Sequence, residues 1–328
     1  MGSLSRGISV PYSGRVYAKT ENYYGIENAS SPGYTISGCI INAKIDTGTC
    51  YEPKWCIGSG SAASLYRYMS TPSDPTFHLE WIYDSACTFS LASYCINRID
   101  RSSIGRVTLG IGNLTPLTFE MSTNMYDSVV SHRSQFKLLG CKCKSITLSG
   151  KRGDEWIYSA DFSVKRVTSA ASVSTSSWAP QGLNRSPNYC LFNTAGSVFT
   201  HVVSATYPGS WSSASAFITD NISVTIDHSL QDLWTSNSPW KVEAIPGALK
   251  VTGSSDVSID EGGGAVFANI QGRLSACSLQ IQMQSAATCK RFLSLRGVKY
   301  DSFSVELNTS GNVMMTSKPF NASLAKLI

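Results

Sequence analysis

The sequence is organised around one segment, Leu138-Leu139-Gly140-Cys141-Lys142-Cys143-Lys144-Ser145-Ile146-Thr147-Leu148. Its glycine, lysine and serine recur with the same spacing 157 positions later, as Gly297, Lys299 and Ser302. With one inserted residue the likeness continues, because Gly153 then matches Gly311 and Phe162 matches Phe320. Self-similarity at a fixed offset is typical of repeated structural units. The sequence therefore predicts a tandem duplication of one β-rich unit.

A shorter match lies near the start of each half. Residues 41–46 and 222–227 place apolar residues on the same face, and each segment ends in an aspartate, Asp46 or Asp227. The alternative interpretation is that any two amphipathic strands look alike. Because aspartate favours turns, we expect both carboxylates to have a structural role at the end of a strand rather than an acid–base role.

Alternation of apolar and polar residues with a period of two dominates the chain. In residues 156–165 the even positions are apolar, which predicts a strand with one buried face. Helices are predicted only over short stretches, about 61–69, 127–138 and 285–295. Each copy of the repeat then consists of a short helix, a glycine turn and two strands. The fold class is therefore mainly β.

The division of the chain follows from the repeat. Residues 171–188 are rich in Ser, Thr and Pro and lack alternation, which indicates a linker or a long surface loop. We expect a first β domain at 1–170, including an N-terminal arm, and a second β domain at 189–328.

Composition limits the class of protein. Of the 328 residues, 42% are apolar and only 15% are charged, which excludes a coiled coil, a long helical bundle and a disordered chain. No run approaches the roughly 18 apolar residues that cross a bilayer, and Met1–Arg6 has no signal-peptide pattern, so we expect no membrane span. The net charge of +5 is weak evidence for a nucleic-acid partner.

Motifs for catalysis or metal binding are absent from the sequence. The four histidines have no ligand spacing, no CxxC pair occurs, and no nucleophile or phosphate-binding motif is found. We therefore expect no catalytic residue, no metal and no cofactor. The ten cysteines are interpreted as buried free thiols, with disulfides or a metal site as alternatives. Basic residues cluster within 133–152 and 290–299, where they form either a solvated face or a contact with an acidic surface of a neighbouring subunit.

Two segments resemble the major tail protein family, the tail tube proteins of tailed bacteriophages and tailed archaeal viruses. Residues 139–165 are similar to a strand pair of the type G-V-K-V-x-S-L-x-L-S and V-x-V-D-F-x-G-K. Cys141 and Cys143 replace the usual valines, and Val164 stands where a glycine is expected. Residues 221–254 resemble a later segment, S-x-x-I-D-N-x-L followed by G-x-x-x-V-T-G-S, and the order of segments agrees across about 120–325.

The resemblance implies a fold and a role in assembly. Tail tube subunits are β-sandwich or split-barrel units with a short flanking helix, and they join edge to edge into rings that stack around a lumen. With two units per chain, a homotrimer would close a pseudo-hexameric ring, and we expect it in preference to a homohexamer. The implied partners are further copies of the chain, other tail proteins, and double-stranded DNA only in passage. The implied location is the virion tail, assembled in the host cytoplasm.

Two other classes compete with this interpretation. A viral adhesin or lectin-like β-sandwich module would carry clustered surface aromatic residues in a shallow groove. A hydrolase of the viral tail would carry two facing carboxylates in a cleft, and no such pair is marked in the sequence.

Overall fold

The structure is a computed structural model that describes residues 8–9, 15–28, 34–35, 40–48, 51–56, 64–70, 73–82, 91–98, 113–126, 133–151, 154–169, 198–202, 215–216, 219–257, 277–285, 289–301 and 316–327. The described part is mainly β, and its strand pairs are antiparallel. Its elements in chain order are β1 Ile8–Ser9, β2 Arg15–Thr20, β3 Tyr34–Thr35, β4 Ile40–Asp46, β5 Tyr51–Cys56, β6 Ser64–Ser70, β7 Thr76–Ile82, α1 Leu91–Ile96, β8 Leu117–Tyr126, β9 Arg133–Lys151, β10 Ile157–Ser163, β11 Arg166–Ser169, β12 Val198–Val202, β13 Ser215–Ala216, β14 Thr219–Asp227, β15 Gln231–Leu233, β16 Glu243–Ile245, β17 Lys250–Val257, β18 Cys277–Ser285, β19 Cys289–Tyr300, β20 Thr316–Ala322 and β21 Leu324–Leu327.

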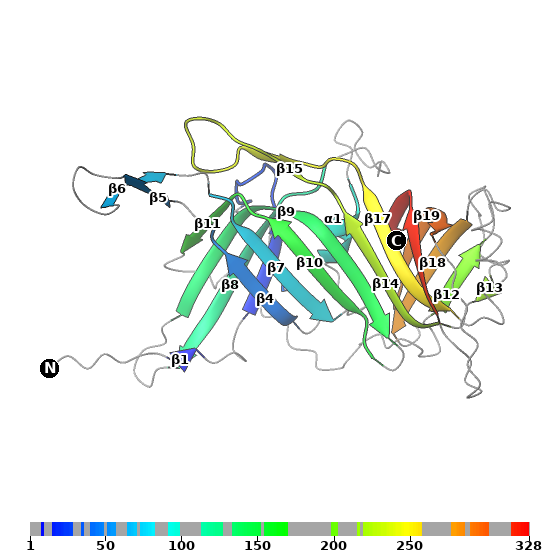
Figure 1. The fold of residues 1–328 in the computed structure, drawn as a ribbon. Helices are drawn as coiled ribbons and strands as arrows, with labels where there is room; N and C mark the ends of the chain where they lie inside the picture. Colours follow the sequence, from blue (N-terminus) through cyan, green and yellow to red (C-terminus); the bar gives the residue numbers. More distant parts are fainter. Residues whose placement is uncertain are drawn as a thin grey trace.

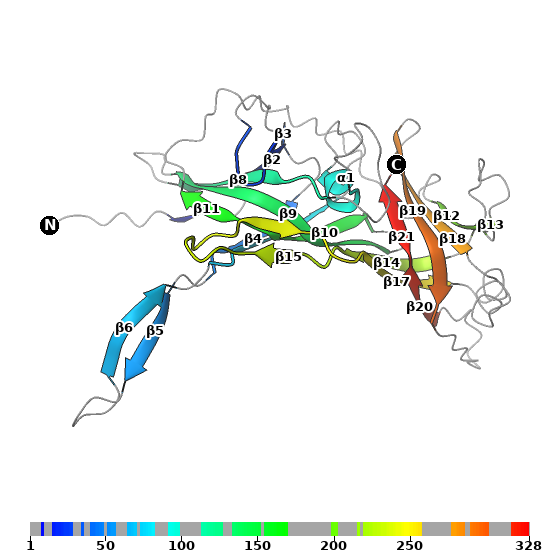
Figure 2. The same ribbon diagram turned by 90° about the horizontal axis from the view of Figure 1, so that it is seen from above.

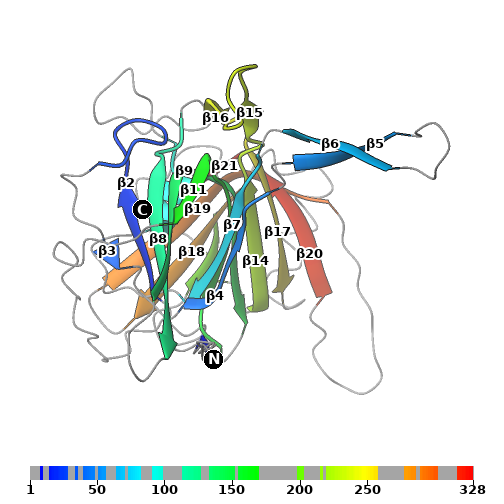
Figure 3. The ribbon, with the colours of Figure 1, turned by 90° about the vertical axis from the view of Figure 1, so that its left-hand side faces the viewer.

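A first group of strands forms two layers that share β9 (Figures 2 and 3). In the main sheet, β4, β7, β10 and the C-terminal half of β9 lie side by side in that order. In the second layer, β2, β8, the N-terminal half of β9 and β11 follow one another. The strand passes from one layer to the other at Gly140, whose φ of 65° is accessible to glycine at little cost.

A second group of strands has the same order of pairing. Its main-sheet strands are β14, β17, β20 and the C-terminal end of β19. Its second layer consists of β12, β18, the N-terminal part of β19 and β21. The long strand changes layer at Gly297, where φ is 59°.

The two groups also agree in their irregularities. The pairing of β8 with β9 shifts register between Leu117 and Phe119, and the pairing of β18 with β19 shifts register between Cys277 and Leu279. After each main-sheet hairpin, one backbone N–H returns to the carbonyl oxygen just before the positive-φ glycine. These bonds run from Lys165 to Leu139 at 3.0 Å and from Ser323 to Arg296 at 2.9 Å.

The core lies between the layers and follows the predicted alternation. The apolar even positions from 156 to 164 are all buried, which confirms the prediction of one buried face for this strand. Phe162 packs against Phe77 and Phe119, with ring centroids 5.9 and 4.9 Å away. In the second group, the buried Phe320 packs against Tyr300 with centroids 5.8 Å apart. Such aromatic pairs contribute roughly 1 kcal/mol each beyond the burial of their surface.

The helices predicted at 61–69, 127–138 and 285–295 are wrong where the structure describes them. β6 occupies most of the first stretch, β9 begins at Arg133, and β18 and β19 cover the third except for 286–288. Short apolar runs fit both periods, and strands on both sides of β9 supply backbone partners that favour the extended form.

A single helix, α1, is present in the described part of the chain. It buries Leu91, Ala92, Cys95 and Ile96 and packs against β9 and β21, so that it touches both groups of strands. Asn97, just after the helix, exchanges two hydrogen bonds with the backbone of Leu327, at 3.2 and 3.3 Å. The predicted linker at 171–188 lies outside the described residues.

Candidate assembly interface

The two groups of strands are joined by direct pairing of β14 with β9 (Figure 1). The pairing is antiparallel and regular from Asn221 opposite Lys151 to Asp227 opposite Ser145. On the outer face, the hydroxyl oxygens of Thr147 and Thr225 lie 2.9 Å apart and share a hydrogen bond. The main sheet therefore runs unbroken through β4, β7, β10, β9, β14, β17, β20 and the end of β19.

The two aspartates singled out in the sequence close turns of the same kind. Asp227 Oδ1 accepts a hydrogen bond from the backbone N–H of Ser229 at 2.7 Å, and Asp46 Oδ1 accepts one from Gly48 at 2.9 Å. Ser229 and Gly48 both have positive φ, 48° and 69°. Each carboxylate thus holds the chain in a tight turn as it leaves its strand.

A strap of residues 228–249 connects β14 to β17 and lies across the first group (Figure 1). Lys142, on β9 and 1% exposed, anchors it. Its Nζ donates hydrogen bonds to Glu243 Oε1 at 2.6 Å, to the carbonyl oxygen of Ala244 at 2.7 Å and to Asn113 Oδ1 at 2.8 Å. The same ammonium lies 5.1 Å from the centre of the Tyr24 ring. A cation removed from water requires such a full set of partners.

A second buried lysine fixes the strap from its own side. Lys241, 1% exposed, donates to Ser163 Oγ at 2.5 Å and forms ion pairs with Asp232, at 2.9 Å, and with Asp74. Ser163 ends β10, and Asp74 precedes β7. The strap is therefore tied to three elements of the first group: β9, β10 and the segment before β7.

Arg98, which follows α1, binds both ends of the strap, at His228 and at Gly247. Arg98 Nε donates to His228 Nδ1 at 3.1 Å, and Arg98 Nη1 donates to the carbonyl oxygen of Gly247 at 2.8 Å. His228 Nε2 lies 2.6 Å from the carbonyl oxygen of Cys95, so this nitrogen carries the proton. Burial lowers the pKa of His228 to about 4, which keeps the ring neutral and able to accept from Arg98.

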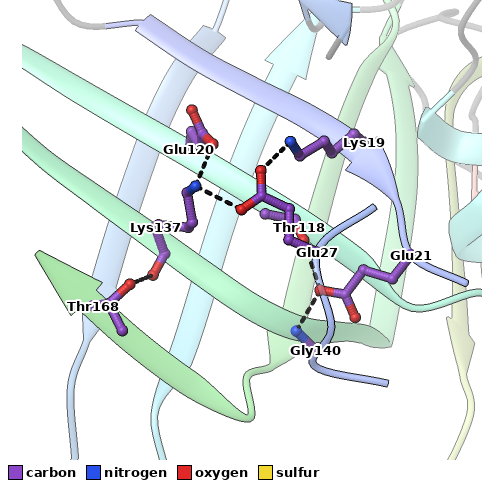
Figure 4. Close-up of polar contacts among 8 residues, drawn as sticks. All are labelled: Lys19, Glu21, Glu27, Thr118, Glu120, Lys137, Gly140 and Thr168. Carbon is purple, nitrogen blue, oxygen red and sulfur yellow. Dashed lines mark hydrogen bonds and ion pairs between the residues drawn. The ribbon is translucent and has the colours of Figure 1, made fainter. Parts of the chain in front are cut away.

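The bend at Gly140 is held by a buried carboxylate (Figure 4). Glu21 Oε1 accepts hydrogen bonds from the Gly140 N–H at 2.9 Å and from Thr118 Oγ1 at 2.6 Å, and Glu21 Oε2 accepts one from the Gly25 N–H at 2.7 Å. Burial raises the pKa of Glu21, although these hydrogen bonds act in the opposite direction. The carboxylate thus fixes the point where β9 changes layer.

Part of the predicted basic cluster is paired within the chain. Lys137 donates to Glu27 Oε2 at 2.7 Å and lies 3.2 Å from Glu120 Oε1 (Figure 4). Glu27 also pairs with Lys19. Lys137 and Lys142 thus have acidic partners in their own chain, where a solvated face or an acidic neighbouring subunit was expected.

The main sheet ends differently on its two sides. In the described residues, β4 is paired in register with β7 alone, so its other edge carries no strand. At the far end, Lys299 and Tyr300 of β19 pair with Asn321 and Phe320 of β20. Lys299 is exposed, in contrast to Lys142 at the corresponding place in the repeat.

The remaining sequence-predicted residues fall into two sets. The structure places Gly140 at the bend held by Glu21, Lys142 at the strap contact and Ser145 at the β9–β14 joint. Gly153, Ser302 and Gly311 lie outside the described residues. Over the residues described, no three His, Cys, Asp or Glu side chains are grouped as a metal site, and no helix is long and apolar enough to cross a membrane.

No model of a known protein family matches this chain, and no characterised protein matches it in sequence. A function for this interface therefore has to be argued from its own geometry.

Proposed function

We propose that this chain is the structural subunit of a viral tail tube, and that it assembles edge to edge into stacked rings. The observation that carries the proposal is the pairing of β14 with β9 inside the chain. β14 adds itself to the edge of the first group, while β4, which holds the same place in its own group, pairs with β7 alone in the described part of the chain. An unpaired edge favours pairing with another chain.

The proposed subunit is a tandem of two β-sandwich or split-barrel units. Strand order, the bulge opposite the long strand and the positive-φ glycine recur in both groups, which supports descent from one unit. The turns closed by Asp46 and Asp227 are a further feature that the two groups share. The first unit would carry α1 as its flanking helix, and the matching stretch after β17 lies outside the described residues.

The ring follows from repeating the internal joint between chains. In this arrangement, β4 of one chain pairs with the β19 edge of the next, as β14 pairs with β9. This contact is head-to-tail, so it closes into a ring or continues as a helix. Three chains would supply six units, and we favour this homotrimeric, pseudo-hexameric ring over a homohexamer. Closure leaves no free edge within the ring.

The outer face of the main sheet suits the wall of a DNA conduit. At the joint it carries the hydroxyl side chains of Ser145, Thr147, Ser223 and Thr225, which are all half-buried. Farther along the sheet, it holds an exposed carboxylate, Asp161, paired with His78 at 2.8 Å. The same cross-strand row carries the exposed Lys44 and Lys250, with the carboxylates of Asp161 and Asp227 between them. Such a mixed row would let double-stranded DNA pass without holding its phosphates. The other proposed partners are tail proteins at the ends of the tube.

Electron microscopy of the purified chain at increasing concentration tests the proposal. We expect rings and stacked tubes, with three chains per ring in a cryo-electron microscopy reconstruction. Six chains per ring would overturn the trimer while retaining the tube. A chain that stays monomeric at every concentration and binds glycans on an array would overturn the tube and favour an adhesin.

A further inference from the structure

Both groups of strands carry a hairpin in the connection between their first two main-sheet strands. In the second group this connection is the strap, with β15 and β16 paired to each other and docked on the first group. In the first group, the connection between β4 and β7 holds β5 and β6. These two strands are paired with each other, and no other strand of the described part is in register with them. Figures 2 and 3 show β5 and β6 standing away from the layers.

The two hairpins leave the main sheet on the same side but then diverge: Figure 2 shows β15 along the layers of the first group, and β5 and β6 turned away from the layers. Figure 1 shows both above the main sheet, each extending leftward from its own pair of strands. For β15 and β16, this direction leads onto the first group of the same chain. For β5 and β6, it leads past the edge of β4 that carries no strand of the described part. An isolated two-stranded hairpin is at best marginally stable in water, so it favours a partner.

The surface that the strap covers has a counterpart in the second group. The strap buries Lys142, and its Lys241 bonds to Ser163, the residue that pairs with Lys142 across β9 and β10. In the second group the corresponding cross-strand pair is Lys299 and Asn321. Ser163 is 5% exposed and Lys142 is 1% exposed, whereas Lys299 and Asn321 are both exposed. The surface that the strap covers in the first group therefore has a counterpart in the second group, and the side chains of that counterpart are exposed.

We propose that the β5–β6 hairpin docks on a second copy of this chain, over the β19–β20 surface marked by Lys299 and Asn321. The contact repeats between chains what the β15–β16 hairpin does within one chain. It rests on the proposed head-to-tail assembly and adds to it a specific clasp: each chain reaches over the second group of its neighbour while the β4 edge pairs beside it. Within a ring, the clasp and the strap would alternate around the circumference.

Photo-crosslinking of the assembled protein tests the clasp. Trp55, in β5, is replaced by the photoreactive p-benzoylphenylalanine, and chains of normal and heavy nitrogen are mixed before assembly. We expect crosslinks that join one chain to peptides of another chain containing Lys299 or Asn321. As a matched control, the same probe replaces Leu233 in β15, which is 46% exposed, and should crosslink to the first group of its own chain.

Any other pattern of crosslinks contradicts the proposed docking of the β5–β6 hairpin. A crosslink from position 55 within its own chain, to the first group of another chain, or to no chain at all contradicts it. The proposed function fails separately, if neither rings nor tubes form. Head-to-tail dimers with the expected crosslink but without rings would retain the clasp and overturn the tube.

A charge reversal at the docking surface gives a second test of the clasp. Lys299→Glu should reduce the yield of the interchain crosslink at least fivefold, and urea unfolding of the single chain, measured beside it, separates a loss of docking from a loss of stability. As a control, Lys151→Glu changes an exposed lysine at the C-terminal end of β9 and should leave the crosslink yield unchanged. Equal yields from the two variants would contradict the docking site.

Discussion

Lys142 on β9 and Glu243 on the strap form an ion pair with an Nζ–Oε1 distance of 2.6 Å, across 101 positions of sequence. Because the lysine is 1% exposed, its partners replace the water it has lost. Lys142→Ala should therefore lower the free energy of unfolding by about 3 kcal/mol. Lys144→Ala, which changes the exposed lysine two residues along the same strand, should change it by less than about 0.5 kcal/mol. Urea unfolding of the unassembled chain measures both, and equal losses would contradict the anchoring role.

The two positive-φ glycines should differ in how well they tolerate a methyl group. A Cβ at Gly140 would lie 2.7 Å from Lys165 Cβ and 3.2 Å from the backbone nitrogen of Gly25, so Gly140→Ala adds steric conflict to an unfavourable φ. We expect a loss of about 3 kcal/mol. At Gly297 the obstruction is the Ser323 hydroxyl, which can rotate, so Gly297→Ala should cost about 1–2 kcal/mol.

The second glycine offers an internal control. Ser323→Ala removes the obstructing hydroxyl, so Gly297→Ala should cost less in that background than in the native chain. No such rescue is available at Gly140, where the obstruction includes backbone. Urea midpoints of the single and double variants decide this, and equal costs at both glycines would contradict the steric argument.

Acid should loosen the strap through His228. The pKa of this ring is about 4 when folded and 6.5 without burial, so between these values the unfolded chain binds a proton that the folded chain does not. Stability therefore falls as the pH drops from about 6.5 to 4, by roughly 3 kcal/mol. Protonation would also place a cation against Arg98, although Asp227 nearby acts in the opposite direction.

Two variants check the assignment of this pH dependence. His228→Gln has no ionisable ring and should flatten the decline between pH 6.5 and 4. Glu21 contributes with the opposite sign, because its raised pKa lets the folded chain hold a proton that the unfolded chain has lost. Glu21→Gln should therefore make the acid decline steeper. Urea midpoints against pH measure both slopes, and an unchanged slope in His228→Gln would contradict the role of this histidine.

The sequence predicted the main-sheet strands best where one face is buried. Trp156 to Val164 and Ile222 to Ile226 alternate strictly, and burial of every second side chain follows from that period. The helix prediction at 127–138 failed because the backbone partners of β9 come from β8 and β11. Local periodicity holds no information about those partners.

The strap could not be predicted from sequence. Lys142, Lys241, Glu243 and Arg98 are ordinary charged residues at scattered positions, and their partners lie up to 149 positions away. No local pattern distinguishes a buried lysine from a solvated one, since burial depends on which loop folds over it. The repeat was the one available signal. It marks Lys142 and Lys299 as equivalent places, and the difference in their exposure becomes informative only once the strands are in position.

Three buried thiols make a final prediction possible. Cys95, Cys141 and Cys143 are free and at most 2% exposed, and burial raises the pKa of Cys141 and of Cys143 well above its usual range. A covered thiol reacts slowly, and the raised pKa slows Cys141 and Cys143 further, since the thiolate is the nucleophile. Iodoacetamide at pH 8 without reductant should leave these three unlabelled in the native chain and label all of them in urea. Peptide mass spectrometry reads each site separately. Labelling of Cys141 in the native chain would contradict the closed core around β9, and a failure to label any of the three in urea would indicate that its thiol is already oxidised.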